Sequence, residues 1–358
     1  MTKRILVLGA GSGASNNLIR SLRAGDRDLV IIGGQADRFV LKKSLADRTY
    51  LIAAREDPDF AASLRRVVNA EAIDLVVPNS DADVRAVSAH RFRVGTRVFL
   101  PSADVIELCQ DKYALTTFLH SHGIPTPETY PVPDVERVEA VFGQLAPRRR
   151  LWCRMRSGSG SMGALPVTAP DQARSWIAYW EQMRGVAPGL FTLSEYLPGR
   201  DFNVQGVWKD GKLAVLKMIE RLAYYGGTNH PSGMSSTPAL ARTLCEPGVL
   251  DVAATAVAAL EALASGVFNV DLKENADGVP CVTEINAGRF AMITNIYDLT
   301  GKHNTALVFV RLALDEPIEV AEPWDVAEDH YLVRDLDTEP GIFHADELSN
   351  RVEEMWPQ

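Results

Sequence analysis

The sequence predicts an α/β domain with a doubly wound parallel sheet, followed by an α+β domain. Three observations support this fold class. Short apolar segments alternate with helical stretches in the N-terminal third of the chain, whereas strand pairs separated by tight turns dominate the remainder. A segment rich in proline and glycine, residues 123–127, separates the two patterns. With 358 residues, the chain is long enough for two or three packed units.

The composition is that of an ordinary globular protein, with 46% hydrophobic and 23% charged residues. A net charge of −9 argues against a broad nucleic-acid surface. No apolar run approaches the ~18 residues of a membrane span. The four cysteines are widely spaced and form no CxxC pair, which favours a reducing compartment and argues against a zinc site. Because the chain starts directly with a strand and leaves no room for a signal peptide, we expect a cytoplasmic protein.

The N-terminal region supplies the elements of the parallel sheet. Apolar segments predict strands at residues 3–9, 29–32 and 75–77, and a short strand that ends at residue 100. Helical periodicity predicts helices at residues 15–23 and about 58–70, and two more at 103–109 and 112–122. We therefore place the first domain at residues 1–101 and a helical linker at 102–123.

A glycine-rich turn, Gly9-Ala10-Gly11-Ser12-Gly13-Ala14, follows the first strand. Such a turn lets backbone N–H groups and a helix N-terminus approach a phosphate. Binding of a nicotinamide dinucleotide also needs an acidic residue at the end of the second strand, but the chain has Gly33, Gly34 and Gln35 there. We therefore favour a tight strand–helix turn, which could still hold a small anionic substrate. An NAD(P)-dependent reductase stays an alternative.

The C-terminal region is predicted to consist of hairpins and amphipathic helices. The expected helices lie at residues 171–183, 250–263 and 304–314. The expected strands start at Trp152 and continue at residues 165–167, 191–197, 202–208, 213–222, 267–272 and 282–286. We divide this region into subdomains at residues 124–190 and 191–322, and predict no structure for the acidic tail at 323–358.

A second glycine loop has a stronger phosphate-binding character, and its sequence is Arg154-Met155-Arg156-Ser157-Gly158-Ser159-Gly160-Ser161. Glycine and serine let the main chain wrap around phosphate oxygens, and Arg154 and Arg156 share one strand face as cationic donors. The spacing differs from that of a Walker-type loop. A flexible surface hairpin is the alternative, but the two arginines favour phosphate binding.

Two late strands carry oxygen ligands into an apolar region. Asp271 lies in the first strand, Glu284 and Asn286 lie in the second, and a turn at residues 275–278 joins them. Glu284 and Asn286 share a face because strand side chains alternate. Buried carboxylates require a cation or a hydrogen-bond network, and oxygen-only ligands suit Mg²⁺. The alternative is a solvated hairpin with an acidic face.

Three further features lie between the glycine loop and this hairpin. The backbone at residues 195–197 could pair with an adenine edge, whereas Asp201 could accept from a ribose diol or could be an ordinary turn residue. Lys217 and Arg221 alternate onto one strand face, where they could be solvated charges or could serve a polyphosphate. We prefer the second role for Arg221, because it lies inside an apolar run. The segment at residues 224–233 either lines the pocket of an acceptor substrate or forms a surface loop.

Together these segments resemble the ATP-grasp superfamily, and most closely a single synthetase unit of the carbamoyl-phosphate synthase large subunit. The resemblance covers residues 4–315 and rests on five segments that follow the order of the family. These segments are 111–113 with 123–127, 154–161, 195–201, 268–271 and 284–286. The chain departs from the family pattern at Arg154, Met155, Asp201 and Asp271, and one extra residue precedes Arg289.

The resemblance implies a pre-ATP-grasp domain followed by an ATP-grasp domain, and it assigns roles to the motif residues. The residues expected to bind ATP are Lys112, Arg154, Arg156, Ser157, Gly158, Ser159, Gly160, Ser161, Glu195, Tyr196, Leu197, Asp201 and Lys217. Within that set, the glycine–serine loop forms a lid and Asp201 meets the ribose. Asp271, Glu284 and Asn286 would hold Mg²⁺ or Mn²⁺. Arg221, and Arg289 if it reaches the site, would stabilise the transferring phosphoryl group.

The implied activity is an ATP- and Mg²⁺-dependent ligation of a carboxylate and an amine through an acyl phosphate, with release of ADP and phosphate. Phosphorylation of bicarbonate or carbamate is the second hypothesis for the activity, and an inactive ATP-binding regulator is the third hypothesis. The expected partners are small-molecule substrates, with no nucleic acid and no membrane, and a homodimer is possible.

Overall fold

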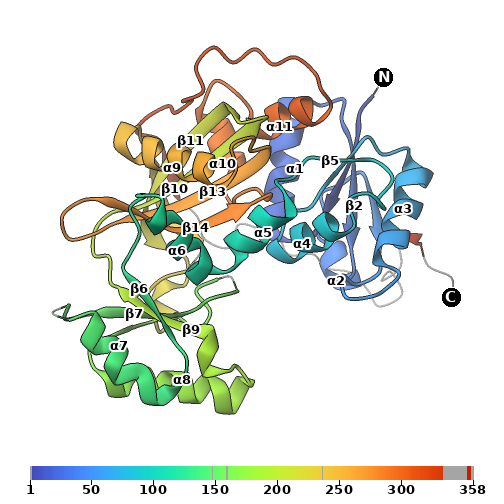
Figure 1. Ribbon diagram of the computed structural model, residues 1–358. Coiled ribbons are helices and arrows are strands. Elements are labelled where there is room, and N and C mark those ends of the chain that lie inside the picture. Colours follow the sequence, from blue (N-terminus) through green and yellow to red (C-terminus); the bar gives the residue numbers. More distant parts are fainter. Residues whose placement is uncertain (1, 147, 159, 236, 334–352, 356–358) are drawn as a thin grey trace.

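The computed structural model describes residues 2–146, 148–158, 160–235, 237–333 and 353–355. These residues form a parallel sheet, a large antiparallel sheet and a smaller antiparallel sheet, each flanked by helices (Figure 1). The α/β domain followed by an α+β domain, predicted from the sequence, is therefore confirmed.

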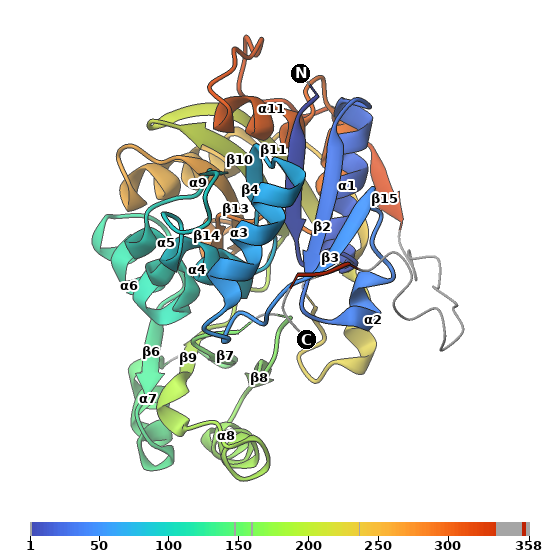
Figure 2. The same cartoon turned by 90° about the vertical axis from the view of Figure 1, so that its right-hand side faces the viewer.

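The N-terminal domain contains the parallel sheet, with the strand order β3-β2-β1-β4-β5. Its strands are β1 (Arg4–Leu8), β2 (Val30–Gln35), β3 (Arg48–Leu51), β4 (Leu75–Val77) and β5 (Arg97–Val98). Its helices are α1 (Gly13–Gly25), α2 (Arg38–Leu41), α3 (Phe60–Glu71) and α4 (Asp81–Ala89). Ile5 and Val7 pack with α1, whereas Leu6 and Leu8 pack with α3 and α4. Helices thus cover both faces of this sheet (Figure 2).

The C-terminal tail, for which the sequence predicted no structure, contributes a strand to each of two sheets. β16 (Glu353–Glu354) pairs with β3 and adds a sixth strand to the parallel sheet. Met355 packs against the core of that domain, and its carbonyl accepts a hydrogen bond from Arg66. β15 (Tyr331–Val333) pairs with a strand of the large antiparallel sheet. Residues 353–355 therefore lie against the N-terminal domain, whereas residues 331–333 belong to the large sheet.

Two linking helices, α5 (Ala103–Gln110) and α6 (Lys112–Ser121), lead to the small sheet. Its strand order is β6-β9-β7-β8, and it forms the lower lobe in Figure 1 together with two helices. The elements of this lobe are β6 (Thr129–Val132), η1 (Val135–Arg137), α7 (Val138–Gln144), β7 (Leu151–Met155), β8 (Leu165–Val167), α8 (Pro170–Arg184), η2 (Pro188–Leu190) and β9 (Phe191–Glu195). Because β9 pairs with β6 and β7, we propose a subdomain boundary after Glu195 instead of after residue 190.

The large antiparallel sheet has the strand order β14-β13-β10-β11-β12-β15. Its other elements are β10 (Asp201–Lys209), β11 (Lys212–Tyr224), η3 (Gly227–Asn229), β12 (Pro238–Thr243), α9 (Pro247–Leu260), β13 (Gly266–Glu274), β14 (Pro280–Ala287), α10 (Thr294–Thr300) and α11 (Thr305–Ala313). The predicted helix at 250–263 thus starts and ends three residues earlier, at Pro247 and Leu260.

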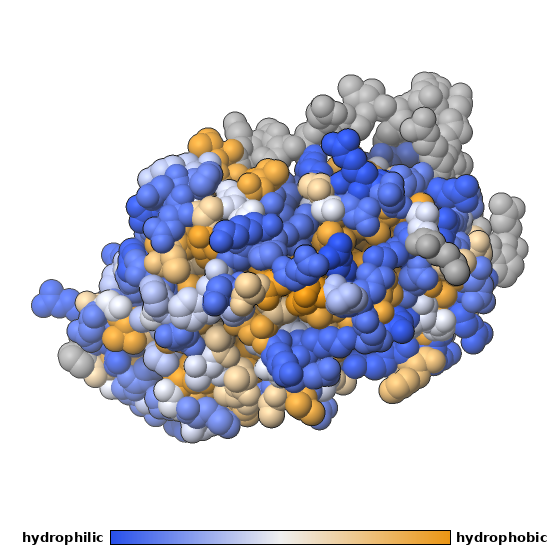
Figure 3. Space-filling view, turned by 90° about the horizontal axis from the view of Figure 1, so that it is seen from above, coloured by the Kyte–Doolittle hydropathy of each residue, from blue (hydrophilic) through white to orange (hydrophobic). Residues whose placement is uncertain are grey.

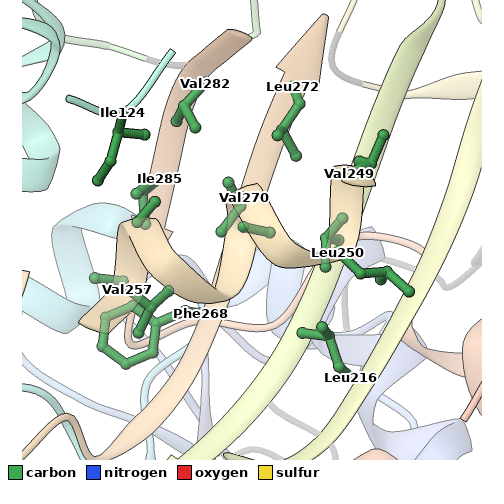
Figure 4. Close-up of a cluster of buried hydrophobic side chains, with 14 of the residues drawn as sticks. Ile124, Leu216, Val249, Leu250, Val257, Phe268, Val270, Leu272, Val282 and Ile285 are labelled. Atoms are coloured by element: carbon green, nitrogen blue, oxygen red, sulfur yellow. The ribbon is translucent and has the colours of Figure 1, made fainter. Parts of the chain in front are cut away.

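The two faces of the large sheet differ in character. Val270 and Leu272 of β13 pack against Val257 and Leu250 of α9, which crosses the apolar face (Figure 4). Alternate residues of the same strands are polar and lie on the opposite face. This polar face, turned toward the rest of the molecule, is where the predicted site residues gather.

None of the helices within the described ranges is both long and apolar enough to cross a membrane. The face seen from above is mostly hydrophilic, with smaller hydrophobic areas between the polar ones (Figure 3).

Candidate active site

A cavity of about 870 Å³ lies where the three sheets meet. The N-terminal domain lines it with Ser12 and Asn79, and the small sheet contributes Arg154. The polar face of the large sheet contributes Asp271 and Glu284. The volume falls in the range of cofactor and substrate pockets and leaves room for more than one ligand.

The three predicted metal ligands come together on a hairpin formed by β13 and β14, which we call the carboxylate hairpin. Asp271 lies directly opposite Glu284 in this ladder, and Asn269 lies opposite Asn286. Residues that oppose each other across antiparallel strands share a face, so these side chains all turn toward the cavity. Asn286 Nδ2 lies 3.4 Å from Asp271 Oδ2.

Each of these three side chains also has a cationic partner. Lys112 Nζ lies 3.6 Å from Glu284 Oε2, which forms an ion pair across the cavity. Arg221 Nη2 donates to Asp271 Oδ1 at 2.5 Å. Arg289 Nη2 donates to Asn286 Oδ1 at 2.5 Å. The protein therefore balances the charge of the hairpin with groups that can also bind phosphate.

The carboxylate hairpin fits a hard divalent cation. Two carboxylates and an amide oxygen form an oxygen-only set, which Mg²⁺ and Mn²⁺ prefer. Within the described ranges, no group of three or more His, Cys, Asp and Glu side chains is arranged to hold a metal ion. Mg²⁺ takes few protein ligands and completes its shell with water and phosphate oxygens, so a set of two carboxylates and one amide oxygen fits it.

Arg289 reaches the cavity despite the extra residue that precedes it. Gly288 turns the chain at the end of β14 with φ +87°, in a space where a Cβ atom would lie 2.9 Å from Leu100. The guanidinium then donates to Asp81 at the start of α4 as well as to Asn286. Burial alone would lower the pKa of Arg289, but the charge of Asp81 outweighs it and raises the pKa. Arg289 therefore connects the N-terminal domain to the hairpin as a fixed cation.

Asp201 and Arg221 lie opposite each other on β10 and β11. Arg221 Nη1 donates to Asp201 Oδ1 at 2.8 Å, and the Tyr224 hydroxyl donates to Asp201 Oδ2. The pKa of Arg221 is raised because the charges of Asp271 and Asp201 outweigh the effect of burial. Burial and the charge of Asp201 raise the pKa of Tyr224, so its hydroxyl stays protonated and donates.

The glycine–serine loop closes one side of the cavity, and we call its residues 157–163 the lid loop. Ser157, Gly158, Gly160 and Ser161 line the cavity, and Ser159 lies outside the described residues. Gly158 has φ +108° and its carbonyl accepts a hydrogen bond of 2.6 Å from Lys112 Nζ. A Cβ atom at that φ would be strained, which explains a glycine at this position.

Arg154 joins the small sheet to the carboxylate hairpin. Its Nη2 donates to the carbonyl of Thr283 at 3.1 Å, and its buried Nε has no hydrogen-bond partner in the described part of the chain. Burial lowers the pKa of Arg154, whereas the charge of Glu284 works in the other direction. A buried donor without a partner is costly, so this guanidinium is suited to an anionic ligand.

Two predicted phosphate ligands do not reach the cavity, and the first is Arg156. Its guanidinium donates to Asp111 at 2.5 Å and lies 5.2 Å from the ring centre of Tyr113. Asp111 caps α6, the helix that begins with Lys112. Arg156 therefore lies outside the cavity lining instead of at the predicted phosphate position, and we propose that it holds the helix that carries Lys112.

Lys217 is the second predicted phosphate ligand that does not reach the cavity. It is 2% exposed and lies beneath α10 and α11. Its Nζ donates to the carbonyls of Tyr297 and His303 at 2.9 and 2.5 Å, and it pairs with Asp325 at 3.2 Å. Lys217 shares a sheet face with Arg221, as predicted, but helices cover that part of the face. Its expected role in nucleotide binding is therefore replaced by a structural one.

The predicted adenine segment lines the opposite end of the cavity. Glu195, Tyr196 and Leu197 are all part of its wall, as are Trp152 and Ser194. Ser194 is 1% exposed, and its Oγ has no hydrogen-bond partner among the residues described. Sequence reasoning missed Trp152 and Ser194, although alternation along β7 and β9 could have indicated their shared face.

The N-terminal domain forms the remaining wall at the carboxyl ends of its strands. Asn79 follows β4 and is 3% exposed; its Oδ1 accepts from Phe290 N, and its Nδ2 has no partner within the described ranges. Ser12 precedes α1, and Arg85 lies on α4. Strand order reverses between β1 and β4, the place where ligands bind in such sheets. Sequence reasoning predicted the glycine turn here but missed Asn79 and Arg85.

The segment at 224–233, considered for an acceptor pocket, reaches the cavity only in part. Of its residues, all of which are described, Tyr224 lines the wall. Met234, Ser235 and Pro238 extend that wall beyond the segment.

No protein-family model matches the chain. Solved structures with a similar fold include the L-amino acid ligase from Bacillus licheniformis, with a TM-score of 0.67 and 14% identity over 89% of this chain and 75% of the ligase chain. Biotin carboxylase from Campylobacter jejuni has a TM-score of 0.70 and 12% identity, over 92% and 74% of the two chains. The N5-carboxyaminoimidazole ribonucleotide synthetase from Thermotoga maritima has a TM-score of 0.63 and 18% identity, over 90% and 78%. The likeness extends over both predicted domains.

Proposed function

We propose that this chain, which has the ATP-grasp fold, is an ATP- and Mg²⁺-dependent ligase that joins a carboxylate to an amine and releases ADP and phosphate. The observation that carries the proposal is the meeting of an oxygen-only carboxylate hairpin with four cations around one cavity. These cations are Lys112, Arg154, Arg221 and Arg289. The similar structures include a ligase and a synthetase, and related carboxyaminoimidazole ribonucleotide synthases were crystallised with ATP or ADP.

In this proposal the nucleotide spans the cavity from residues 195–197 to the carboxylate hairpin. Adenine pairs with the backbone of 195–197 and lies near Trp152 and Ser194. The phosphates then extend toward Arg154 and Lys112, under the lid loop. Guanidinium and ammonium groups held around a polyphosphate both align it and neutralise its charge, which are the main requirements of phosphoryl transfer.

Asp271, Glu284 and Asn286 would hold Mg²⁺, with Mn²⁺ as a substitute. The metal, when bound, supplies neutralisation of the charge on the phosphate oxygens. The hairpin residues keep the ligand oxygens on one sheet face, and Arg221 and Arg289 hold two of them in place through hydrogen bonds.

The chemistry that fits these groups has two steps. A substrate carboxylate oxygen attacks the γ-phosphorus, the bond to the bridging oxygen breaks, and ADP leaves with the electron pair. Arg221 and Arg289 stabilise the charge that spreads over the transferred phosphoryl group. The amine nitrogen then attacks the acyl carbon of the acyl phosphate, phosphate departs, and the amine proton passes to that phosphate. The lid loop excludes water, which would otherwise hydrolyse the acyl phosphate.

The organic substrates would enter at the end of the cavity that the N-terminal domain forms. The α1 N-terminus, the unpartnered Nδ2 of Asn79 and Arg85 all offer donors there. These groups favour a substrate with a carboxylate or another anionic group.

A second candidate keeps the same site but changes the acceptor. A 2-oxoglutarate carboxylase domain of similar fold was crystallised as a dimer with MgADP and a bicarbonate anion. Phosphorylation of bicarbonate or carbamate would use the same cations and the same hairpin. A homodimer of this chain is likewise a proposal, which light scattering would test. The reductase alternative has less support, because β2 ends in Gln35 without an acidic residue.

A substrate screen tests the proposal. Purified protein is incubated with MgATP and pairs of amino acids or small carboxylic acids, while phosphate release and product mass are recorded. We expect phosphate release that depends on a carboxylate and on an amine, together with an amide product. Phosphate release with bicarbonate alone would favour the second candidate. Thermal stabilisation by NADH, but not by MgADP, would contradict both.

A further inference from the structure

We infer that Asp201 is a positioning residue that holds Arg221 in its working orientation, and that it is not the acceptor for the ribose of the nucleotide. This inference rests on the proposed function, since it concerns the phosphoryl-transfer role of Arg221. It reverses the role that the sequence motif implied for Asp201.

The guanidinium of Arg221 is held at both of its ends by carboxylates from neighbouring strands. Nη1 donates to Asp201 on β10 at 2.8 Å, and Nη2 donates to Asp271 on β13 at 2.5 Å. The side chain of Arg221 is 12% exposed. A planar guanidinium gripped at two points has little freedom to rotate, so its direction is set before any ligand arrives.

Both oxygens of Asp201 are already in use. Oδ1 accepts from Arg221, and Oδ2 accepts from the Tyr224 hydroxyl. Lys273 Nζ also lies 3.7 Å from Oδ2. The carboxylate is 9% exposed. A ribose diol would compete with buried, charge-assisted hydrogen bonds for these oxygens without supplying their charge, which makes Asp201 a poor ribose acceptor.

An independent observation indicates what the fixed guanidinium is for. Arg221 Nε is buried and has no hydrogen-bond partner among the residues that the structure describes. An unsatisfied buried donor on a charged group carries a penalty that an anionic ligand would remove. Because Arg221 lines the cavity beside Asp271, a phosphoryl oxygen held at the carboxylate hairpin is the acceptor that suits this donor.

Asp201 also gives Arg221 an ionic contact that lies outside the proposed metal site. Without Asp201, the remaining ionic contact of Arg221 among the described residues would be Asp271, which the proposed function assigns to Mg²⁺. Tyr224 supports the arrangement because its hydroxyl fixes the second oxygen of Asp201. The pair Asp201–Tyr224 should therefore affect the rate of phosphoryl transfer more than the binding of nucleotide.

The test compares Asp201→Asn and Tyr224→Phe with the wild type, using ATP and 2′-deoxy-ATP as nucleotides. We expect kcat of Asp201→Asn to fall on the order of 10²-fold and that of Tyr224→Phe about tenfold. KM for ATP and thermal stabilisation by MgADP should hardly change. The ratio of kcat/KM between ATP and 2′-deoxy-ATP should equal that of the wild type in both variants. Asp277→Asn, in the exposed turn of the hairpin, and Tyr179→Phe, on the exposed side of α8, are matched controls.

A double-mutant cycle provides the second measurement. If Asp201 acts through Arg221, adding Asp201→Asn to Arg221→Ala should cause no further loss of kcat. Independent losses that add in the double variant would overturn the inference. A ribose role would instead appear as lost activity with ATP but not with 2′-deoxy-ATP, and as weaker stabilisation by MgADP. Failure of the wild type to turn over MgATP would remove the proposed function, and the inference with it, which is a different outcome from either of these.

Discussion

Asp271 and Glu284 lie directly opposite each other on β13 and β14, and both side chains turn into the cavity between the domains. Two carboxylates at neighbouring positions repel each other unless a cation lies between or beside them. Arg221 and Lys112 provide part of that compensation. Under the proposed function, this pair marks where a divalent cation and a polyphosphate would be held together.

The first prediction concerns Glu284. Glu284→Gln keeps the shape of the side chain but removes its charge, so Mg²⁺-dependent ATP turnover should fall by about 10²-fold or more, as for other lost transition-state contacts. The melting temperature should remain close to that of the wild type, because Glu284 is partly exposed. Steady-state phosphate release and thermal melting measure the two effects. Glu181→Gln on the exposed side of α8 is the control, and unchanged turnover in Glu284→Gln would remove Glu284 from the site.

The second prediction concerns Arg154, which contacts the carboxylate hairpin and has a buried Nε without a partner among the described residues. Arg154→Ala should raise KM for ATP about tenfold, since a charged hydrogen bond contributes roughly 1.5–3 kcal/mol. Arg154→Lys should recover part of this loss, because it restores charge but not the two-pronged geometry. Initial rates over a range of ATP concentrations provide the measurement. The control is Arg149→Ala at an exposed position, and equal KM values in all three variants would contradict the phosphate role.

The elements that the sequence predicted well depend on local patterns. The carboxylate hairpin was expected at 267–272 and 282–286, and the strands extend over Gly266–Glu274 and Pro280–Ala287. Alternation of apolar and polar residues is enough to place Asp271, Glu284 and Asn286 in one region, because the register follows from a short turn. The arrangement of an α/β domain followed by an α+β domain follows from such local motifs in order, and solved structures of similar fold confirm it.

The features that the sequence did not predict depend on contacts between distant segments. Lys217 and Arg221 have the same strand periodicity, but only the first is covered by α10 and α11. Asp201 could not be assigned to Arg221 before the pairing of β10 with β11 was known. Asn79 follows a three-residue strand and lies in no motif, so neither its burial nor its free Nδ2 could be foreseen. Packing between distant segments determines the surroundings of these three residues, and the local sequence pattern does not predict that packing.

The third prediction tests the structural role of Lys217. Lys217→Met leaves the buried carboxylates of Asp298 and Asp325 without their cation, which typically costs about 3–5 kcal/mol of unfolding free energy. MgADP should still stabilise the folded variant at low temperature, because Lys217 does not line the cavity. Denaturant unfolding with and without MgADP distinguishes the two roles. A stable Lys217→Met variant that no longer responds to MgADP would restore the original assignment, and Lys212→Met at the exposed start of β11 is the control.

The fourth prediction gives this buried cluster a pH dependence. Although burial opposes the shift, hydrogen bonds from the N–H groups of Lys302 and His303 and the charge of Lys217 lower the pKa of Asp325. A lowered folded pKa means that the carboxylate stabilises the fold above its unfolded pKa of about 3.9. This contribution disappears as the pH falls through the folded value. The difference in unfolding free energy between the wild type and Asp325→Asn should therefore narrow between about pH 5 and pH 2. A difference that stays constant would show that Asp325 contributes through shape alone.

The fifth prediction concerns Lys112, whose Nζ lies 2.6 Å from the Gly158 carbonyl and 3.6 Å from Glu284. One ammonium group thus links the lid loop to the carboxylate hairpin, so its removal should loosen the loop as well as weaken phosphate binding. In Lys112→Met, hydrogen exchange should rise at residues 157–163 while the core of the small sheet remains protected. Turnover of MgATP should fall in the same variant, because the phosphates lose a cation that aligns them, and an open lid should also divert the acyl phosphate to hydrolysis. Loss of turnover with unchanged exchange in the loop would assign Lys112 to phosphate binding alone, and Lys43→Met serves as the matched control at an exposed position of the N-terminal domain.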